Sequence, residues 1–215
     1  MTLRVAVLAS GEGSTLQALL DAHAQGALPV EFVGLFSDRP GAGALERALQ
    51  AGVPVCAISP KSFATRIEHD RALFARVEQV QPELIVCAGY MRIISAEVAQ
   101  QFEGRMLNLH PSLLPRHRGL HTHRQCLSAG DSVHGASVHW VTAELDGGPV
   151  ISQARLPVLT DDTETTLQAR VRQVERPLLL STLQALADGR LQHGQGLRFL
   201  DPHHQLQAHE VYACP

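Results

Sequence analysis

An amide and an imidazole stand two residues apart at the end of an apolar run, at Asn108 and His110. Residues i and i+2 of a β-strand project to the same side, so a strand here would aim both side chains at one point. Pro111 would end strand pairing because it has no N–H to donate. A neutral donor beside a titratable donor suits an oxygen that becomes negative during a reaction. The alternative is a strand end whose polar groups bond to loop backbone.

A second candidate site is the glycine-containing loop Ser10-Gly11-Glu12-Gly13-Ser14-Thr15, which joins an apolar run to an amphipathic segment. Glycines allow a tight turn, and the N–H groups at the start of a following helix favour a phosphate. The loop has neither the Lys of a P-loop nor the third Gly of a dinucleotide fingerprint, so a plain turn is the alternative. We expect the carboxylate of Glu12 to point to solvent, because it would repel a phosphate.

Two further loops could take part in chemistry. The segment Ala88-Gly89-Tyr90-Met91-Arg92-Ile93-Ile94 offers backbone polar groups beside apolar side chains, as a flat heteroaromatic ligand requires. The alternative is an ordinary connection from a strand to a helix. The segment Glu144-Leu145-Asp146-Gly147-Gly148-Pro149 has the composition of a solvated turn. If this turn folds over the strand that bears His110, Asp146 would favour the charged form of the imidazole.

Apolar runs alternate with amphipathic segments through the first half of the chain. We predict strands at residues 4–9, 31–37, 53–58 and 84–88, and helices at 14–25, 43–51 and 62–79. The hydroxyl side chains of Ser14 and Thr15 can cap the N-terminus of the first helix. Alternating strands and helices predict an α/β fold, with a three-layer, doubly wound, mostly parallel sheet and helices on both faces. Strands that are apolar throughout fit a sheet covered on both sides.

The second half of the chain continues with less regular spacing. The predicted order is a helix at 95–102, a strand that ends at His110, a loop at 111–120, a helix at 122–129, two runs at 135–141 and 149–157, and a helix at 164–187. The two runs are joined by a short loop and are expected to form an antiparallel pair. Pro177 should kink or restart the last helix. We expect one domain over residues 1–190 and an extension at 191–215 that packs on the domain or trails from it.

Composition excludes several classes of function. The net charge is −3 and no basic run is present, so no nucleic-acid partner is expected. The first apolar run is too short to cross a membrane and lacks the layout of a signal peptide, which predicts a cytoplasmic protein without a membrane partner. Cys56, Cys87, Cys126 and Cys214 form no C-x-x-C pair. The histidines, His121 and His123 included, lack a supported ligand spacing, so we expect no metal.

Five segments together resemble the phosphoribosylglycinamide formyltransferase family, the folate-dependent enzymes of purine synthesis with a Rossmann-like formyltransferase fold. The resemblance covers residues 3 to 190. The sequence Asn-x-His-Pro-Ser-Leu-Leu-Pro with a downstream Asp-Gly-Gly is specific for folate-dependent formyltransferases, and Ser-Gly-x-Gly-Ser narrows the match to this family. The segments that carry the resemblance are residues 10–19, 88–93, 108–115, 119–123 and 138–141 together with 145–149.

The resemblance implies that the amine of glycinamide ribonucleotide attacks the formyl carbon of 10-formyltetrahydrofolate, the co-substrate, without a covalent enzyme intermediate. Asn108 and His110 match the residues that stabilise the oxyanion, and Asp146 matches the acid that keeps this histidine charged. The Leu114–Pro115 bond matches a cis peptide. The implied ribonucleotide-binding residues are Gly13, Ser14, Thr15, Arg172 and Glu175. The implied folate-binding residues are Arg66, Met91, Arg92, Ile93, Ile94, Asn108, Thr142, Ala143, Glu144, Leu145 and Asp146.

Three residues depart from the family pattern. Members commonly carry Asn at the positions of Glu12 and Thr15 and Gln at the position of Arg172. Thr15 should serve if its contact with the phosphate is through the backbone N–H, whereas affinity for the phosphate would drop if the side chain is needed. The charge of Arg172 could offset that of Glu12. Alternative functions are a formyltetrahydrofolate hydrolase, a formyltransferase acting on another substrate, and a folate- or nucleotide-binding protein without activity. We expect a monomer or a homodimer.

Overall fold

The computed structural model describes residues 2–191, 198–200 and 205–208 of the 215-residue chain. It forms two compact units, and each is described by itself. Unit 1 comprises Met1–Leu109 and Trp140–Gly148, and unit 2 comprises His110–His139 and Pro149–Pro215. The strands are β1 Leu3–Leu8, β2 Val30–Ser37, β3 Val55–Ala57, β4 Leu84–Cys87, β5 Met106–His110, β6 Val133–Trp140, β7 Val150–Pro157, β8 Arg198–Leu200 and β9 Leu206–Ala208. The helices are α1 Ser14–Ala24, α2 Gly43–Gln50, the short 3₁₀ helix η1 Pro60–Ser62, α3 Arg66–Gln79, α4 Ala96–Gln101, α5 Thr122–Ser128 and α6 Glu164–Ala187.

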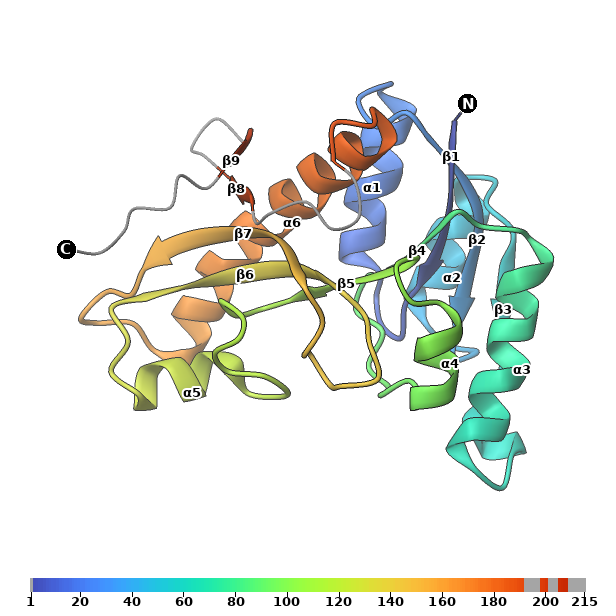
Figure 1. The fold of residues 1–215 in the computed structure, drawn as a ribbon, viewed down its shortest axis with the longest axis horizontal. Coiled ribbons are helices and arrows are strands. Elements are labelled where there is room, and N and C mark those ends of the chain that lie inside the picture. Colours follow the sequence, from blue (N-terminus) through green and yellow to red (C-terminus); the bar gives the residue numbers. More distant parts are fainter. Residues whose placement is uncertain (1, 192–197, 201–204, 209–215) are drawn as a thin grey trace. The chain divides into compact units, whose positions relative to one another are not determined.

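A parallel sheet forms the centre of unit 1. Its strands lie in the order β3-β2-β1-β4-β5, and each neighbouring pair is parallel. Helices cover both faces: α1 packs beside α2 on one face, and α3 packs beside α4 on the other (Figure 1). Parallel strands covered on both faces have to be apolar throughout, which explains why β1 and β4 are buried along almost their whole length.

The core under α3 and α4 shows how the sequence selects this packing. Leu73, Phe74 and Val77 recur at helical spacing on α3 and are at most 1% exposed. They pack with Ile85 of β4 and Phe102, which follows α4, in one buried cluster. Burial of each large apolar side chain contributes about 1.5–3 kcal/mol, so this layer rigidly supports the carboxyl ends of the strands.

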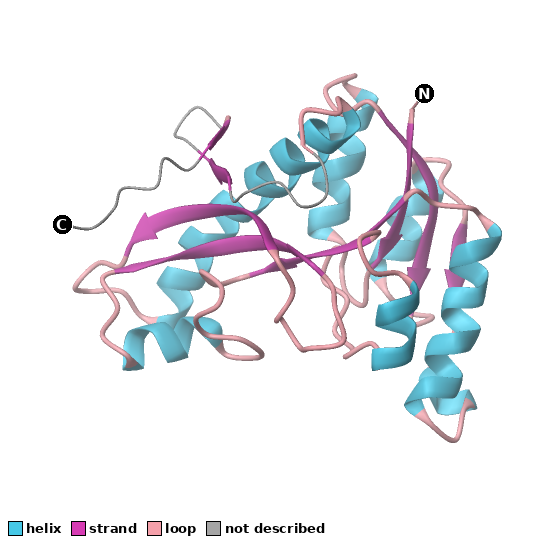
Figure 2. Cartoon of the chain, in the orientation of Figure 1, coloured by secondary structure: helices cyan, strands magenta, loops and turns pink. Residues whose placement is uncertain are grey.

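Unit 2 is built on an antiparallel pair. β6 pairs with β7 in antiparallel orientation, β8 pairs with β7 in parallel, and β9 pairs with β8 in antiparallel orientation. The long helix α6 packs against β7 and contacts α5 (Figure 2). Val171, Leu178, Leu179 and Leu183 on α6 are fully buried.

Most of the predicted elements are confirmed within a few residues, and so is the α/β class with a mostly parallel sheet and an antiparallel pair in the C-terminal half. The last helix was expected to kink or restart at Pro177, and it does not restart, because α6 continues through this residue. Ser14 and Thr15 were expected to cap α1, but the N-cap is Gly13 and no side chain caps this end. Among the described residues, no helix has both the length and the apolar character needed to cross a membrane.

The C-terminal extension falls partly outside the described residues. Its described part contains β8 and β9, which the sequence did not predict because both strands have only three residues. Pairing with β7, rather than local periodicity, defines this hairpin. The division into a domain at 1–190 and an extension at 191–215 stays a prediction.

Candidate active site

Three candidate segments of unit 1 meet at one edge of its sheet. β1, β4 and β5 are parallel, and Cys87 at the end of β4 is in register with Leu8 on one side and Asn108 on the other. The glycine loop follows β1 and the Ala88–Ile94 segment follows β4, so both loops and the half-buried Asn108 lie at the carboxyl edge. Open α/β sheets bind their ligands at this edge.

The glycine loop is held in a conformation that requires Gly13. This residue has φ +75°, and a Cβ there would lie 2.7 Å from Cα of Ala44. The loop is anchored to α2, because Ala44 N donates to Gly11 O at 3.1 Å and Arg47 Nε donates to Glu12 O at 2.7 Å. With no side chain capping α1, its first N–H groups face the loop and suit a phosphate.

The departure at Glu12 is accommodated by α2. The side chain is exposed, as expected, and its carboxylate lies beside Gly43, where a Cβ would approach it to 2.7 Å. Gly43 is the first residue of α2, and the positive end of a helix dipole favours a carboxylate. The negative charge of Glu12 is therefore partly offset by α2.

The segment from Gly89 to Ser95 is fixed at both ends by buried side chains. At the first end, Met91 N donates to Ser10 Oγ at 2.9 Å, and Ser10 Oγ donates to Asp38 Oδ1 at 2.5 Å. At the other end, Ser95 N donates to Asp70 Oδ2 at 2.8 Å. Ser10, Asp38 and Asp70 are at most 4% exposed. A loop fixed in this way is preorganised for a ligand.

Asp70 is itself oriented by a histidine. Its Oδ1 lies 3.2 Å from Nδ1 of His69, and Nε2 of the same ring lies 2.9 Å from the carbonyl oxygen of Ile58. Both side chains of this pair are fully buried. Such a pair stabilises the fold only while both partners are present.

Asp70→Ala should therefore destabilise the protein by about 3–5 kcal/mol, because it leaves His69 and the N–H of Ser95 without their buried partner. Urea unfolding measures this change. Asp70→Asn is the matched control, since its amide oxygen can still accept from Ser95 N. The free energy of unfolding of this variant should fall clearly less than that of Asp70→Ala. Equal losses for the two variants would contradict a specific role for the Ser95 contact.

Apolar side chains are exposed in both loops that the sequence assigned to folate. Met91 is 67% exposed and Ile93 is 52% exposed in the first loop, and Leu145 is 48% exposed in the second. Exposed apolar side chains of this kind can pack on a flat ligand, although similar exposure also occurs elsewhere on the chain, as at Leu49 and Leu120. Arg92, Ile94 and Thr142 are half-buried, while Ala143 and Glu144 are exposed.

The loop at 142–148 turns back sharply after β6. Gly147 N donates to Glu144 O at 3.1 Å, and Asp146 has φ +48° in the left-handed region. A Cβ at Gly148 would lie only 1.9 Å from the carbonyl oxygen of Trp140, so this position requires glycine. The two glycines therefore allow the close turn that holds Asp146, which is half-buried.

His110 ends β5 and is the first residue of unit 2. It is 5% exposed, its Nε2 lies 3.0 Å from the carbonyl oxygen of His117, and its ring packs edge-on against His139 at 6.4 Å. A carbonyl only accepts, so this contact places a proton on Nε2. Asn108 lies two residues earlier on the same strand.

The loop after His110 is tied to β6 and β7. Ser137 Oγ donates to Ser112 O at 2.7 Å and accepts from Leu114 N at 3.0 Å, while Gln153 Nε2 donates to Leu114 O at 2.9 Å. The Leu114–Pro115 bond is cis, as the resemblance implied. The loop is therefore anchored at the residues that follow the catalytic candidate.

Two residues of α6 were assigned to the ribonucleotide, Arg172 and Glu175. Arg172 is exposed, and its charge lowers the pKa of the buried His123, for which burial is the larger cause. Burial raises the pKa of the Glu175 carboxyl, and the charges of Arg172 and Arg176 oppose this shift. Both residues belong to unit 2, whereas Gly13, Ser14 and Thr15 belong to unit 1.

A buried histidine pair in unit 2 makes stability depend on pH. Nδ1 of His123 lies 3.1 Å from Nε2 of His134, and burial, with the charges of His123 and His117, lowers the pKa of His134 to about 4. The unfolded chain binds this proton near pH 6.5, so stability falls as pH drops below that value. We expect His134 to account for a loss of about 3 kcal/mol between pH 7 and pH 4.

Urea unfolding at the two pH values tests this expectation against His134→Gln, which cannot titrate at that position. The variant should lose less stability on acidification than the unmodified protein. The same pH dependence in both proteins would show that His134 is not responsible.

Residues that position the loops were missed at the sequence level. Ser10, Asp38, His69 and Asp70 were not among the predicted site residues, although Asp70 interrupts the apolar face of α3 and Asp38 directly follows β2. A polar residue within an apolar helix face, or directly after an apolar strand, was the sequence feature that could have identified these positions. Arg66 was predicted as a folate residue, and it is exposed at the first position of α3. Among the catalytic candidates, Asn108 and Asp146 belong to unit 1 and His110 to unit 2.

Comparisons with known proteins identify the family of the chain. Residues 3–183 match the formyl transferase family model. The phosphoribosylglycinamide formyltransferase of Escherichia coli K12 is 43% identical over 199 residues, which are 93% of this chain and 94% of that protein. The solved phosphoribosylglycinamide formyltransferase of Coxiella burnetii has a TM-score of 0.84 at 40% identity and covers 97% of each chain. The glycinamide ribonucleotide transformylase 1 of Symbiobacterium toebii has a TM-score of 0.83 at 37% identity, over 96% of this chain and 93% of that one. The chain belongs to the formyl transferase family.

Proposed function

We propose that this protein transfers the formyl group of 10-formyltetrahydrofolate to the amine of glycinamide ribonucleotide, in purine biosynthesis. The observation that carries the proposal is the carboxyl edge in unit 1, where a glycine loop suited to phosphate, a fixed loop with exposed apolar side chains and Asn108 occur together. Relatives named for this activity at 43% and 40% identity support it. We place the enzyme in the cytoplasm, as a monomer or homodimer.

In the proposed reaction the substrate amine is the nucleophile. Its lone pair attacks the formyl carbon, the carbonyl oxygen becomes negative, and the bond from that carbon to the folate nitrogen then breaks. The folate nitrogen gains a proton and the amine loses one. Asn108 and the charged His110 donate hydrogen bonds to the oxyanion, and Asp146 keeps the imidazole charged. One such donor contributes about 2.7–4 kcal/mol to transition-state stabilisation.

Substrate binding is assigned to groups with matching chemistry. Gly13, Ser14 and Thr15 bind the phosphate through backbone N–H groups, since Thr15 replaces the usual Asn without loss of an N–H. The exposed Met91, Ile93 and Leu145 cover the flat folate ring. Arg92, Ile94 and the backbone of 142–146 complete the folate site, with Arg66 toward its acidic end. Arg172 and Glu175 bind the ribonucleotide.

Absorbance of the folate product, measured with and without glycinamide ribonucleotide, tests the proposal. Turnover only when the ribonucleotide is present is the expected result. Turnover in its absence would assign a formyltetrahydrofolate hydrolase instead. Folate binding without turnover under either condition would assign a binding protein.

A further inference from the structure

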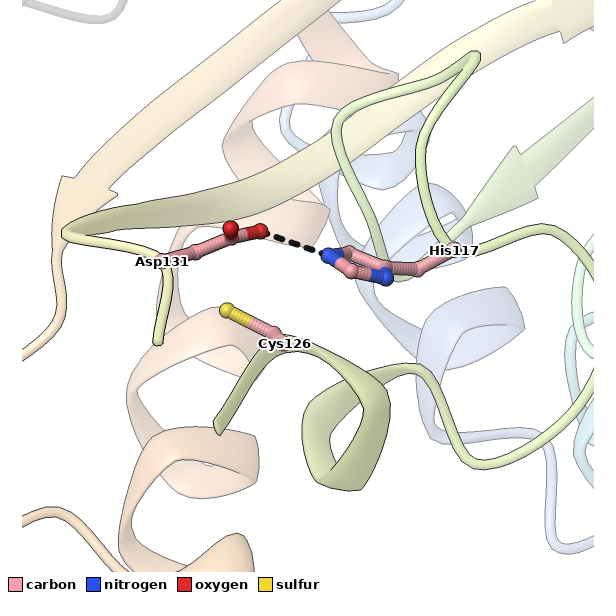
Figure 3. A group of neighbouring side chains, drawn as sticks. All are labelled: His117, Cys126 and Asp131. Atoms are coloured by element: carbon pink, nitrogen blue, oxygen red, sulfur yellow. Dashed lines mark hydrogen bonds and ion pairs between the residues drawn. The ribbon is translucent and has the colours of Figure 1, made fainter. Parts of the chain in front are cut away.

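A mixed cluster of ligand-type side chains lies in unit 2, outside the residues proposed for formyl transfer. His117, Cys126 and Asp131 each offer one donor atom, and these atoms lie within 4.8 Å of one another. Figure 3 shows the three side chains pointing toward one another, with a hydrogen bond between His117 and Asp131. This bond joins Nε2 of His117 to Oδ2 of Asp131 at 2.7 Å.

Three separate pieces of backbone build the cluster. Cys126 lies on α5, and Gly130, with φ +68°, turns the chain after this helix so that Asp131 N donates to Cys126 O at 3.2 Å. His117 comes from the anchored loop before α5 and has φ +54°, in the left-handed region that a histidine rarely adopts. The fold therefore brings an imidazole and a carboxylate beside a thiol, although the three residues are five to fourteen positions apart in the sequence.

The buried thiol of Cys126 has polar neighbours, but no disulfide or hydrogen bond within the described part of the chain would account for them. Cys126 is fully buried and is not in a disulfide, and among the described residues no hydrogen bond involves its sulfur. Its sulfur faces an imidazole and a carboxylate rather than apolar groups alone (Figure 3). A buried cysteine that only fills space needs no such neighbours.

We propose that His117, Cys126 and Asp131 bind one divalent metal ion of the zinc type. Nitrogen, sulfur and carboxylate oxygen are the ligands that zinc takes in proteins, in tetrahedral geometry with bonds of about 2.0–2.3 Å. Such bonds place the ligand atoms about 3.5 Å apart. The imidazole and the carboxylate, now 2.7 Å apart, would therefore separate by about 1 Å, and any pair near the 4.8 Å limit would approach by about 1 Å. The metal replaces the thiol proton, which passes to solvent, and water takes the fourth position. This site is independent of the proposed formyl transfer, which uses no metal.

One neighbouring cation competes for the carboxylate. Arg116 Nη2 lies 2.5 Å from Oδ1 of Asp131, and its side chain is 62% exposed. An exposed guanidinium can swing into water at little cost, because surface ion pairs are weak. Removal of the Arg116 guanidinium should therefore strengthen metal binding. If the three side chains form only ion pairs and hydrogen bonds and no metal site, its removal would not change the affinity for metal.

Titration of the full-length, chelator-treated protein with Co²⁺ tests the site, because cobalt replaces zinc and reports its ligands by absorption. We expect a thiolate-to-cobalt charge-transfer band in the near ultraviolet that saturates at one equivalent and disappears when Zn²⁺ is added. At a hundredfold excess of Zn²⁺ over its Kd, Tm should rise by about 5–10 °C. Absence of the band would overturn the proposal.

Matched variants assign the ligands. Cys126→Ser should abolish the band, while Cys56→Ser, which alters a partly exposed cysteine on β3, should leave it unchanged. Arg116→Gln should lower the Kd for Co²⁺, and Asp131→Asn should raise it at least tenfold. A band that survives Cys126→Ser would overturn the proposal. If Cys126→Ser does not fold, an Asp131→Asn variant with unchanged affinity would overturn it equally.

Discussion

His110→Ala should lower kcat about a thousandfold. The variant removes the charged donor proposed for the oxyanion, and one such donor contributes about a hundred- to thousandfold to the rate. Folate binding should be little changed, since the proposed folate contacts lie elsewhere on the chain. Steady-state kinetics with both substrates and a folate titration measure the two effects.

Two controls separate chemistry from structure at this position. His110 also contacts the carbonyl oxygen of His117, so its removal could release the following loop. His110→Gln retains an N–H that can donate to this oxygen but carries no charge, and it should be nearly as inactive as His110→Ala. His23→Ala changes a histidine on α1 that has no proposed role and should retain full activity. A His110→Ala variant with more than a tenth of the original kcat would remove His110 from the mechanism.

Asp146→Asn should lower kcat by about a hundred- to thousandfold, because the proposed oxyanion donor His110 would lose the carboxylate that keeps it charged, and one such donor contributes about this much to the rate. The substitution tests charge and not backbone, because asparagine tolerates the left-handed conformation found at φ +48°. Without the carboxylate, His110 would lose the negative charge proposed to hold its proton. Thermal unfolding should be nearly unchanged, which distinguishes this loss from misfolding.

Glu144→Gln is the matched control for Asp146→Asn. It removes a carboxylate from the same loop, two residues away, at an exposed position. Glu144 enters the proposed folate site through its backbone, which the substitution retains, and an exposed charge is screened by water and salt, so kcat should stay within a fewfold of the original. Equal losses for the two variants would mean that the net charge of the loop, and not Asp146, is important.

The elements of the sheet in unit 1 were predictable because local pattern and tertiary environment agree there. Runs such as Val5–Ala9 are apolar on both faces, and only a parallel sheet between helices buries both. Pro177 shows where a local rule fails: α6 continues through it, since the buried Leu178, Leu179 and Leu183 continue the apolar face beyond the proline. The short strands β8 and β9 carry too few residues for a pattern and depend on pairing with β7.

The sequence alone determined the family, the order of the elements and the chemical types of the candidate residues, because these depend on residue identity and on spacing along one chain. Only the tertiary structure decided which distant groups touch. Asp38, through Ser10, fixes the loop at Met91, which is 53 residues away in the sequence, and Asp70 fixes it at Ser95, which is 25 residues away. His117, Cys126 and Asp131 form a cluster although they have no ligand spacing in the sequence. Such contacts arise from the packing of helices on a sheet, which brings together residues that no local pattern connects.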